Sequence, residues 1–295
     1  MRNSKIGGQA VMEGVMMKNG AKYAVAVRKP DQEIEVQIFD DKTSVDKVQK
    51  IPVIRGIFNF VSSLVLGMKS LTFSASFIEE EEGEKLSEKQ EKAVMTGTVI
   101  VSLLLAIGIF MVTPYLISLL FGRWIESVTI LSLIEGFARL LIFFVYIILI
   151  SRLKDIQRVF MYHGAEHKCI NCIENGLELT VENVRKSSRL HKRCGTSFLL
   201  IVMIVSVIFF IFIRISSPIL RLAVRLVLIP VIAGVSYEFI KLAGRSENKV
   251  VNWLSKPGLF LQKMTTIEPD DSMIEVGIAS VEAVFDWKKF QEETE

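Results

Sequence analysis

Four long apolar segments, almost free of charged side chains, constrain the fold of this chain more than any other feature. They cover residues 94–121, 128–151, 196–213 and 226–239, the last being extended upstream by residues 217–225. A helix needs about 20 apolar residues to cross the hydrocarbon core of a bilayer. Three of the segments reach this length with their flanks, and 196–213 lies near the lower limit. The sequence therefore predicts a polytopic α-helical membrane protein with about four transmembrane helices.

Positively charged residues predict the orientation of these helices. Residues 151–195 are rich in Lys and Arg, whereas the short link GRWIES between the first two segments contains only Arg123. Because Lys and Arg accumulate in cytoplasmic loops, we expect 151–195 to be a cytoplasmic polar loop and both termini to be cytoplasmic. The link 214–225 also carries arginines, among them Arg225, which weakly favours the opposite orientation. We expect a multi-pass protein of the cytoplasmic (plasma) membrane that contacts the lipid bilayer.

The regions outside the apolar segments predict a small β cap and amphipathic helices. Short β-branched runs within residues 6–39 are separated by KNGA and KPDQ, as in a three-stranded antiparallel meander. A net charge of +3 gives no support for nucleic-acid binding. We expect a cytoplasmic β-rich cap (1–50), an interfacial helix with a charged linker (51–92), a four-helix membrane domain (93–245), and a C-terminal amphipathic region (246–295) broken at Pro257 and Pro269, with a helix starting near Ser272.

The string YHGAEHKCI holds two of the three histidines of the chain, His163 and His167. If the second transmembrane helix continues beyond Arg152, these histidines share one helical face, a spacing that allows two imidazoles to hold one metal ion. H-x-x-E-H is also the order of inverted zincins, in which Glu166 can take a proton from water. We therefore predict a divalent metal site, most simply for zinc, with His191 as third ligand and Glu166 as the catalytic residue.

Other interpretations of this polar segment stay open. Cys194, Glu174, Glu238 and Glu13 are candidates for an additional ligand or for a supporting role around the site. A closed structural zinc site is a second interpretation, because C-x-x-C followed by H-x-x-C resembles knuckle spacing. A third interpretation has the histidines only hydrogen-bonded, without a metal. The knuckle would use Cys169, Cys172, His191 and Cys194.

Ionisable residues inside the apolar segments form a separate group of candidates. Glu135 and Arg139 are four residues apart in the second segment, and Glu238 lies in the fourth. Charged side chains at membrane depth are costly and usually face a partner or a wet cavity. Glu135 and Arg139 are therefore expected to neutralise each other, or to line a polar path as in a transporter. Glu13 lies among glycines, in a stretch that we interpret as a bulged first strand.

Several long strings resemble the YqhQ-like bacterial membrane proteins, a domain family of unknown function sometimes described as predicted metal-dependent enzymes. The resemblance rests on GGQAVMEGVMM, IEGFARLLIF, YHGAEHK, ELTVENVRKSSRLHKRCGTSFLL, SYEFIKLAG and PGLFLQKMTTIEPDDSMIEVGIAS, and it extends over most of the chain. It implies that cysteine is unusual at positions 169 and 172, which argues against the knuckle. It also implies that the family motif falls on His163, Glu166, His167, Glu174, His191 and Cys194.

Two functional hypotheses follow from the sequence. The first is a membrane-embedded metal-dependent enzyme, a hydrolase acting at the cytoplasmic membrane surface on a peptide or a lipid-linked substrate. The alternative is a non-catalytic scaffold or assembly factor that docks onto another membrane-protein complex. Metal coordination discriminates between them, since an ion with an open position supports the enzyme.

Overall fold

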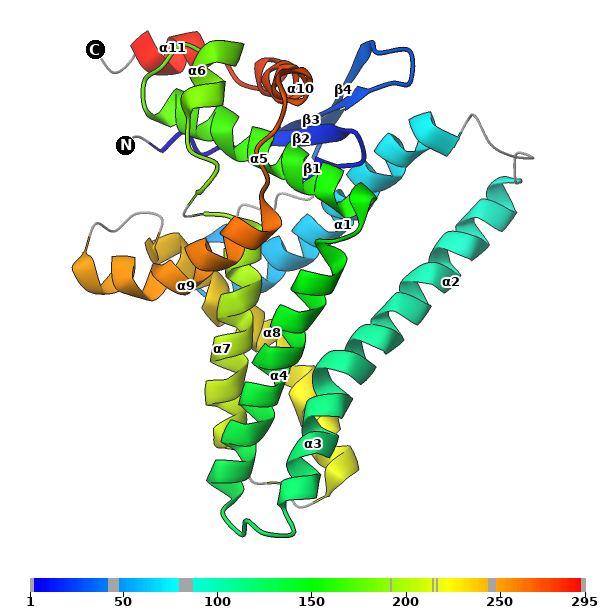
Figure 1. Cartoon of the computed structure of the whole chain (residues 1–295), viewed down its shortest axis with the longest axis vertical. Coiled ribbons are helices and arrows are strands. Elements are labelled where there is room, and N and C mark those ends of the chain that lie inside the picture. The colour runs from blue at the N-terminus through cyan, green and yellow to red at the C-terminus, as the bar shows by residue number, and fades with distance from the viewer. Residues whose placement is uncertain are drawn as a thin grey trace.

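The fold consists of a bundle of long helices that carries an α/β head at one end (Figure 1). The head contains the four strands and helices α5, α6, α10 and α11, and the bundle contains α2, α3, α4, α7 and α8. Helices α1 and α9 lie where the two parts meet. The computed structural model describes residues 3–41, 48–79, 87–191, 193–213, 215, 217–243 and 248–292.

The head is built around an antiparallel sheet of four strands in the order β1-β2-β3-β4. The prediction of three strands was wrong, because Met12 and Glu13 form a tight turn that divides the first predicted strand into a hairpin in which Val11 pairs with Gly14. Glu13 has a backbone φ of 49°, in the left-handed region that closes such turns. The strands are β1 (Gly7–Val11), β2 (Gly14–Asn19), β3 (Lys22–Arg28) and β4 (Ile34–Asp40).

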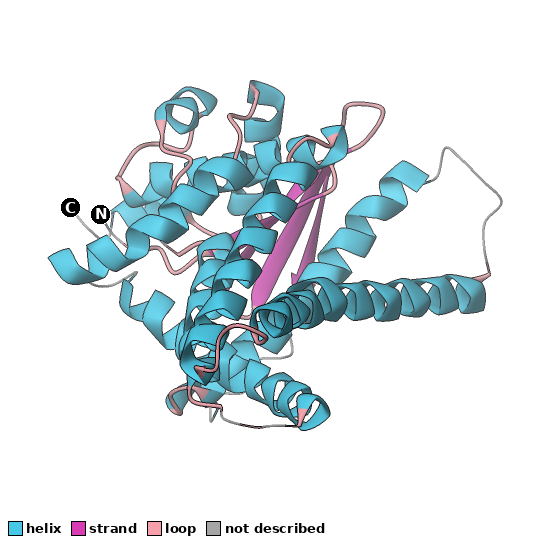
Figure 2. Cartoon of the chain, turned by 60° about the horizontal axis from the view of Figure 1, so that its bottom comes forward, coloured by secondary structure: helices cyan, strands magenta, loops and turns pink. Residues whose placement is uncertain are grey.

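Both faces of the two central strands are buried. One face, which includes Val15 and Met17, packs against the helices α5 and α10. The opposite face, which includes Met16 and Val25, packs against α1. Figure 2 shows the strands enclosed among the helices. Burial on both faces explains why β2 and β3 read as continuous apolar runs instead of alternating polar and apolar residues.

The predicted polar loop 151–195 is mostly helical. The helix α4 (Val128–Ile150) ends before Ser151, and α5 (Lys154–Glu174) begins anew after Leu153. The condition that the second transmembrane helix continues through the histidines is therefore not met, since α5 leaves the bundle at a steep angle to α4 (Figure 1). The short helix α6 (Val181–Lys186) follows, with Thr180 as its N-cap. The two histidines nevertheless share one helix, as the spacing predicted.

The structure contains four helical segments that are long and apolar enough to cross a membrane, and α7 (Gly195–Ile211) is a shorter apolar helix. Three of the four coincide with predicted spans, whereas the fourth lies in α1 and not in the predicted span 196–213. The first of these spans comprises α2 (Glu88–Ile107), the π-helical turn η2 (Gly108–Val112) and α3 (Thr113–Phe121). The other two are α4 and α8, and α8 extends over Pro218–Ala243. Residues 80–86 of the predicted charged linker lie outside the described residues.

The helix α1 (Ile54–Glu79) contacts both parts of the molecule. Its Leu66, Phe73 and Phe77 pack against the sheet, and its N-terminal half packs against α8. Its composition and length would suffice for a membrane span, although contact with the sheet along the C-terminal half is what an interfacial helix would make. A short 3-10 helix, η1 (Val48–Lys50), precedes α1.

The C-terminal region forms three helices. The helix α9 (Lys249–Thr265) continues through Pro257, so the predicted break there was wrong. Gly258 of α9 packs directly on Ser197 of α7, and this tertiary contact offsets the hydrogen bond that proline cannot donate. The helix α10 (Asp271–Glu282) begins at the N-cap Asp270, as the acidic EPDD predicted, and packs on α5 and the sheet. The last helix is α11 (Trp287–Glu292).

Gly164 lies where α5 crosses the segment between α9 and α10, which yields the first prediction. A Cβ atom at Gly164 would lie 2.1 Å from the carbonyl oxygen of Ile267. The same residue is held against α5, because the Ile267 amide donates to the Phe160 carbonyl. We expect Gly164→Ala to lower the free energy of unfolding by about 1–3 kcal/mol, the usual cost of overpacking. Thermal unfolding in detergent would measure this loss.

Gly97→Ala is the matched control for that prediction. Gly97 also lies inside a helix, and a Cβ atom there would meet nothing within 4 Å. Alanine should therefore leave stability unchanged or raise it by up to about 1 kcal/mol, because alanine has the higher helix propensity. Equal melting temperatures for the two variants would contradict the close crossing at Gly164.

Candidate metal centre

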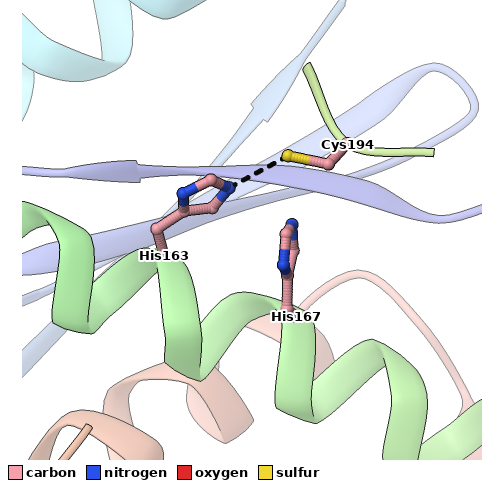
Figure 3. A group of neighbouring side chains, drawn as sticks. All are labelled: His163, His167 and Cys194. Carbon is pink, nitrogen blue, oxygen red and sulfur yellow. Dashed lines mark hydrogen bonds between the residues drawn. The ribbon is translucent and has the colours of Figure 1, made fainter. Parts of the chain in front are cut away.

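The polar face of α5 presents His163 and His167 toward each other. Their ring centroids lie 4.4 Å apart, and both come from the same helix (Figure 3). His163 Nδ1 lies 2.8 Å from the carbonyl oxygen of Thr265, and His167 Nδ1 lies 2.6 Å from that of Arg189. A carbonyl oxygen can only accept, so Nδ1 of each ring carries the proton and Nε2 is left with a lone pair. This is the arrangement in which a backbone group orients a metal-binding histidine.

Cys194 supplies a third donor from a distant part of the chain. Its Sγ atom lies 3.3 Å from His163 Nε2 (Figure 3). One donor atom from each of His163, His167 and Cys194 can be chosen so that all three lie within 4.8 Å of one another. Cys194 is the N-cap of α7, and its Sγ also contacts the backbone amide of Thr196. The start of α7 thus fixes this thiol beside the polar face of α5.

The spacing of one pair of these donors matches that of a tetrahedral divalent ion. Bonds of about 2.1 Å to nitrogen and about 2.3 Å to sulfur would separate the two donor atoms by about 3.6 Å in a tetrahedron. The contact between Cys194 and His163 is close to that value. A thiolate combined with neutral imidazoles suits zinc. Burial lowers the pKa of His167, which keeps its imidazole in the neutral form that a metal requires.

Glu166 is a buried carboxylate beside these donors. Its Oε2 lies 3.4 Å from His167 Nε2, and the backbone amide of Gly8 donates to the carboxylate. Burial raises the pKa of Glu166, although the neighbouring His163 acts in the opposite direction. A Cβ atom at position 8 would lie 2.5 Å from the Met16 carbonyl oxygen and 2.9 Å from Glu166 Cγ. Glycine therefore allows the first strand to approach Glu166 closely.

His191 lies beside the centre and contacts a different carboxylate. Its ring centroid is 5.8 Å from that of His167, and its Nε2 is 3.5 Å from Glu174 Oε2. Glu174 also accepts from Arg193 and from the hydroxyl and backbone amide of Ser4. Burial alone would raise the pKa of Glu174, but these donors lower it to about 2. The carboxylate therefore ties the N-terminal segment to the loop that carries Cys194.

Buried polar side chains hold that loop in place, and sequence reasoning did not identify their role. Lys168 donates to the carbonyl oxygens of Arg185 and Ser187, and Asn171 donates to the Leu190 carbonyl. From α9, Gln262 accepts from the His191 amide and donates to the His191 carbonyl. A loop without regular structure needs partners for its buried backbone groups. The available signal was the presence of Lys168 directly after His167 and of Asn171 one turn beyond His167 on the same helix.

The thiols of the predicted zinc knuckle are not brought together. Cys169 and Cys172 are fully buried in the core between α5 and its neighbours, where Cys169 Sγ lies against Gly277. The Cys172 thiol lies 3.4 Å from the carbonyl oxygen of Glu178. Within the described residues, neither thiol belongs to a cluster of metal-binding side chains. Burial raises the pKa of both thiols, which keeps them protonated.

Two of the candidate carboxylates are engaged elsewhere. Glu13 forms an ion pair with Arg158 of α5 and lies 3.3 Å from the Tyr162 hydroxyl. Burial and the neighbouring Glu13 raise the pKa of Tyr162. Glu238 accepts from Arg55 of α1, with 2.7 Å between Arg55 Nε and Glu238 Oε1. Both carboxylates therefore connect secondary-structure elements and contact arginine instead of the histidines.

Three buried ionisable residues of the bundle form a cluster, because Arg225 joins Glu135 and Arg139. Arg139 lies 2.9 Å from Glu135, and Arg225 binds both carboxylate oxygens of Glu135. Arg139 also donates to the Phe110 carbonyl in the π-helical turn η2. The expectation that Glu135 and Arg139 simply neutralise each other was incomplete. The sequence-based interpretation of Arg225 as part of a polar link was wrong, since it is buried within α8.

Comparisons with known proteins place these residues in a family. The family model described as "Protein of unknown function (DUF1385)" matches residues 51–287. An uncharacterised protein, YqhQ of Bacillus subtilis (strain 168), is 36% identical over 286 residues, which cover 93% of this chain and 90% of that protein. No solved structure matches. The chain therefore belongs to the DUF1385 family of YqhQ-like membrane proteins, a family of unknown function.

Proposed function

We propose that this protein is a membrane-bound, metal-dependent hydrolase that acts at the cytoplasmic membrane surface on a peptide or lipid-linked substrate. The observation that carries the proposal is the convergence of His163, His167 and Cys194 beside the buried carboxylate of Glu166. Three protein ligands with an accessible fourth position are typical of catalytic zinc, whereas structural zinc is enclosed by four. Cys194 also lines a pocket, which supports access to the centre from the Cys194 side.

Each residue has a distinct task in this proposal. His163 and His167 present their Nε2 atoms because Thr265 and Arg189 hold the opposite ring nitrogens. When bound, a zinc ion supplies a Lewis acid and lowers the pKa of a coordinated water to about 7. Glu166 accepts the proton of the attacking water, since a carboxylate whose pKa is raised by burial is a better base near neutral pH.

The proposed cytoplasmic position follows from the distribution of charge. The basic residues between α4 and α7 that predicted this orientation belong to the head, where Arg158 and Arg185 form ion pairs with Glu13 and Asp271. Because positive charge is retained on the cytoplasmic side, we place the head in the cytoplasm. The metal centre then lies on the cytoplasmic side of the bilayer, close to the start of α7.

Elemental analysis of detergent-purified protein tests the metal centre. We expect close to one zinc ion per chain in the wild type and little metal in His167→Ala. His191→Ala should keep its metal, because the His191 ring contacts Glu174 and not Cys194. Equal metal content in all three proteins would refute the centre. A wild-type protein without metal would instead favour the scaffold alternative.

A separate assay tests hydrolysis. Zinc-loaded protein in proteoliposomes would be incubated with peptides and with lipid phosphoesters, and products would be detected by mass spectrometry. Glu166→Gln should reduce turnover by a factor of about 10² to 10⁴, the usual contribution of a general base, while the metal content stays unchanged. Turnover that is equal in wild type and Glu166→Gln would remove Glu166 from the mechanism.

A further inference from the structure

A pocket of about 670 Å³ opens beside the candidate metal centre. Its wall includes Gly8 from the first strand, Phe60 from α1, Cys194 and Gly195 at the start of α7, and Tyr237 near the end of α8. The same Gly8 donates its amide to Glu166, and the same Cys194 contacts His163. The pocket therefore shares Cys194 with the candidate metal centre and Gly8 with the surroundings of Glu166.

The polar side of this pocket is basic. Among the described residues that line it are four cations, Lys5, Lys18, Arg193 and Lys241, and none is Asp or Glu. Lys18 is paired with Asp41 and Arg193 with Glu174, and Lys241 interacts electrostatically with Glu238, so part of the charge is neutralised. Lys5 is exposed and reaches the pocket from the segment before β1. An anionic group would meet several donors there.

The opposite side of the pocket is apolar. The rings of Phe60 from α1 and Phe198 from α7 lie 5.7 Å apart and both line the pocket. Leu66 and Ile240 add aliphatic surface from α1 and α8. Both α1 and α8 contain segments long and apolar enough to cross a membrane. The pocket thus joins a basic surface on the head to apolar helix surfaces that suit contact with acyl chains.

We propose that this pocket binds an anionic membrane lipid, with its phosphate among the basic residues and its acyl chains along α1 and α8. Phosphate oxygens match the lysine and arginine donors in charge. A soluble phosphate would use the basic side only and would leave the apolar side unoccupied. This inference deepens the proposed function and rests on it for one point, namely that the bound lipid is the substrate class that the metal centre receives.

Lipid binding to metal-free protein tests this inference without requiring catalysis. The full-length protein in neutral detergent, treated with a chelator, would be titrated with fluorescent phosphatidylglycerol and, in a parallel titration, with fluorescent phosphatidylcholine. We expect tighter binding of the anionic lipid. Lys5→Glu should weaken that binding about tenfold, and the addition of Lys241→Gln should weaken it further, because each change removes positive charge close to the lipid phosphate.

Lys69→Glu is the matched control, since Lys69 is an exposed cation of α1 outside the pocket lining. It should leave the affinity within about twofold of the wild type, because a distant exposed charge is screened by salt. Equal effects of Lys5→Glu and Lys69→Glu would overturn the site, as would equal affinity for the two lipids. Displacement of the lipid by millimolar inorganic phosphate would show that the ligand is a soluble anion and would also overturn it.

The outcomes separate the two proposals. A protein that binds the anionic lipid through Lys5 but carries no metal would retain the lipid site and lose the enzyme. A protein that carries zinc but binds both lipids equally would retain the metal centre and lose the lipid site. Phe198→Ala adds an independent readout. It should weaken binding of the lipid, because it removes apolar surface from the pocket, while inorganic phosphate should still fail to displace the lipid.

Discussion

Glu135→Gln is expected to destabilise the membrane bundle by about 3–5 kcal/mol, the cost of breaking a buried ion pair by removing one partner. The Glu135 side chain is 4% exposed and bonds to Arg139 and Arg225, whose side chains are buried equally deeply. The substitution leaves two arginines without a counterion among apolar helices. Arg225 Nε already has no hydrogen-bond partner among the described residues, so the cluster has little capacity to compensate. Thermal unfolding in detergent would measure the loss.

A double substitution in the same cluster controls for charge balance. Glu135→Met combined with Arg225→Met removes a carboxylate and a guanidinium together, and replacement of a whole buried pair by apolar residues is often neutral. Arg139 would keep its bonds to the Phe110 carbonyl and to Ser206. The double variant should therefore melt closer to the wild type than Glu135→Gln does. If the double variant were the less stable of the two, charge balance would not be what holds this cluster.

Arg225 illustrates why part of the bundle could not be predicted. The apolar runs predicted α2 to α4 and α8 because hydrophobicity is a local property of the sequence. The partner of an intramembrane charge depends instead on which helices become neighbours. The contact between Glu135 and Arg225 joins residues of α4 and α8. The hydrophobicity pattern around either residue does not predict it. Arg225 therefore looked like a topology signal, although it lies inside the bundle.

In the head, too, features that depend on local sequence were predicted, whereas features that depend on tertiary contacts were not. The turn at Met12 and Glu13 interrupts an otherwise regular apolar pattern, so β1 and β2 were predicted as one strand. The sheet is also buried by α5 and α10, which follow it by more than a hundred residues. No local pattern predicts such a packing. The start of α10, which depends on a local N-cap, was predicted correctly.

The candidate site was predictable where it depends on one helix. The spacing of His163 and His167 placed them on one face whether or not α5 continued the preceding helix. The third donor was not predictable, because His191 and Cys194 are only three residues apart and the sequence places both near the centre. Gln262 fixes the backbone of His191, and the start of α7 fixes Cys194. These contacts bring the thiol, and not the imidazole, next to His163.

Cobalt substitution distinguishes the three proposed ligands from the zinc knuckle. Cobalt-loaded wild-type protein should show the near-ultraviolet charge-transfer absorption of a thiolate ligand, and Cys194→Ser should abolish it. We also expect Cys194→Ser to weaken cobalt binding more than about 100-fold, because even changes behind the ligands weaken metal binding about 10- to 100-fold. Absorption titrations at fixed pH would give both results, since thiolate binding releases a proton and depends on pH.

The combined variant Cys169→Ala and Cys172→Ala is the matched control for Cys194→Ser. Both thiols lie in the apolar core, and burial raises their pKa values, so they are poor ligands as folded. The control should therefore keep the absorption band of the wild type, even if the lost packing lowers its stability. A band that survives in Cys194→Ser and disappears in the control would assign the metal to the knuckle. All four coordination positions of the metal would then be filled by protein ligands, and no open position would remain for hydrolysis.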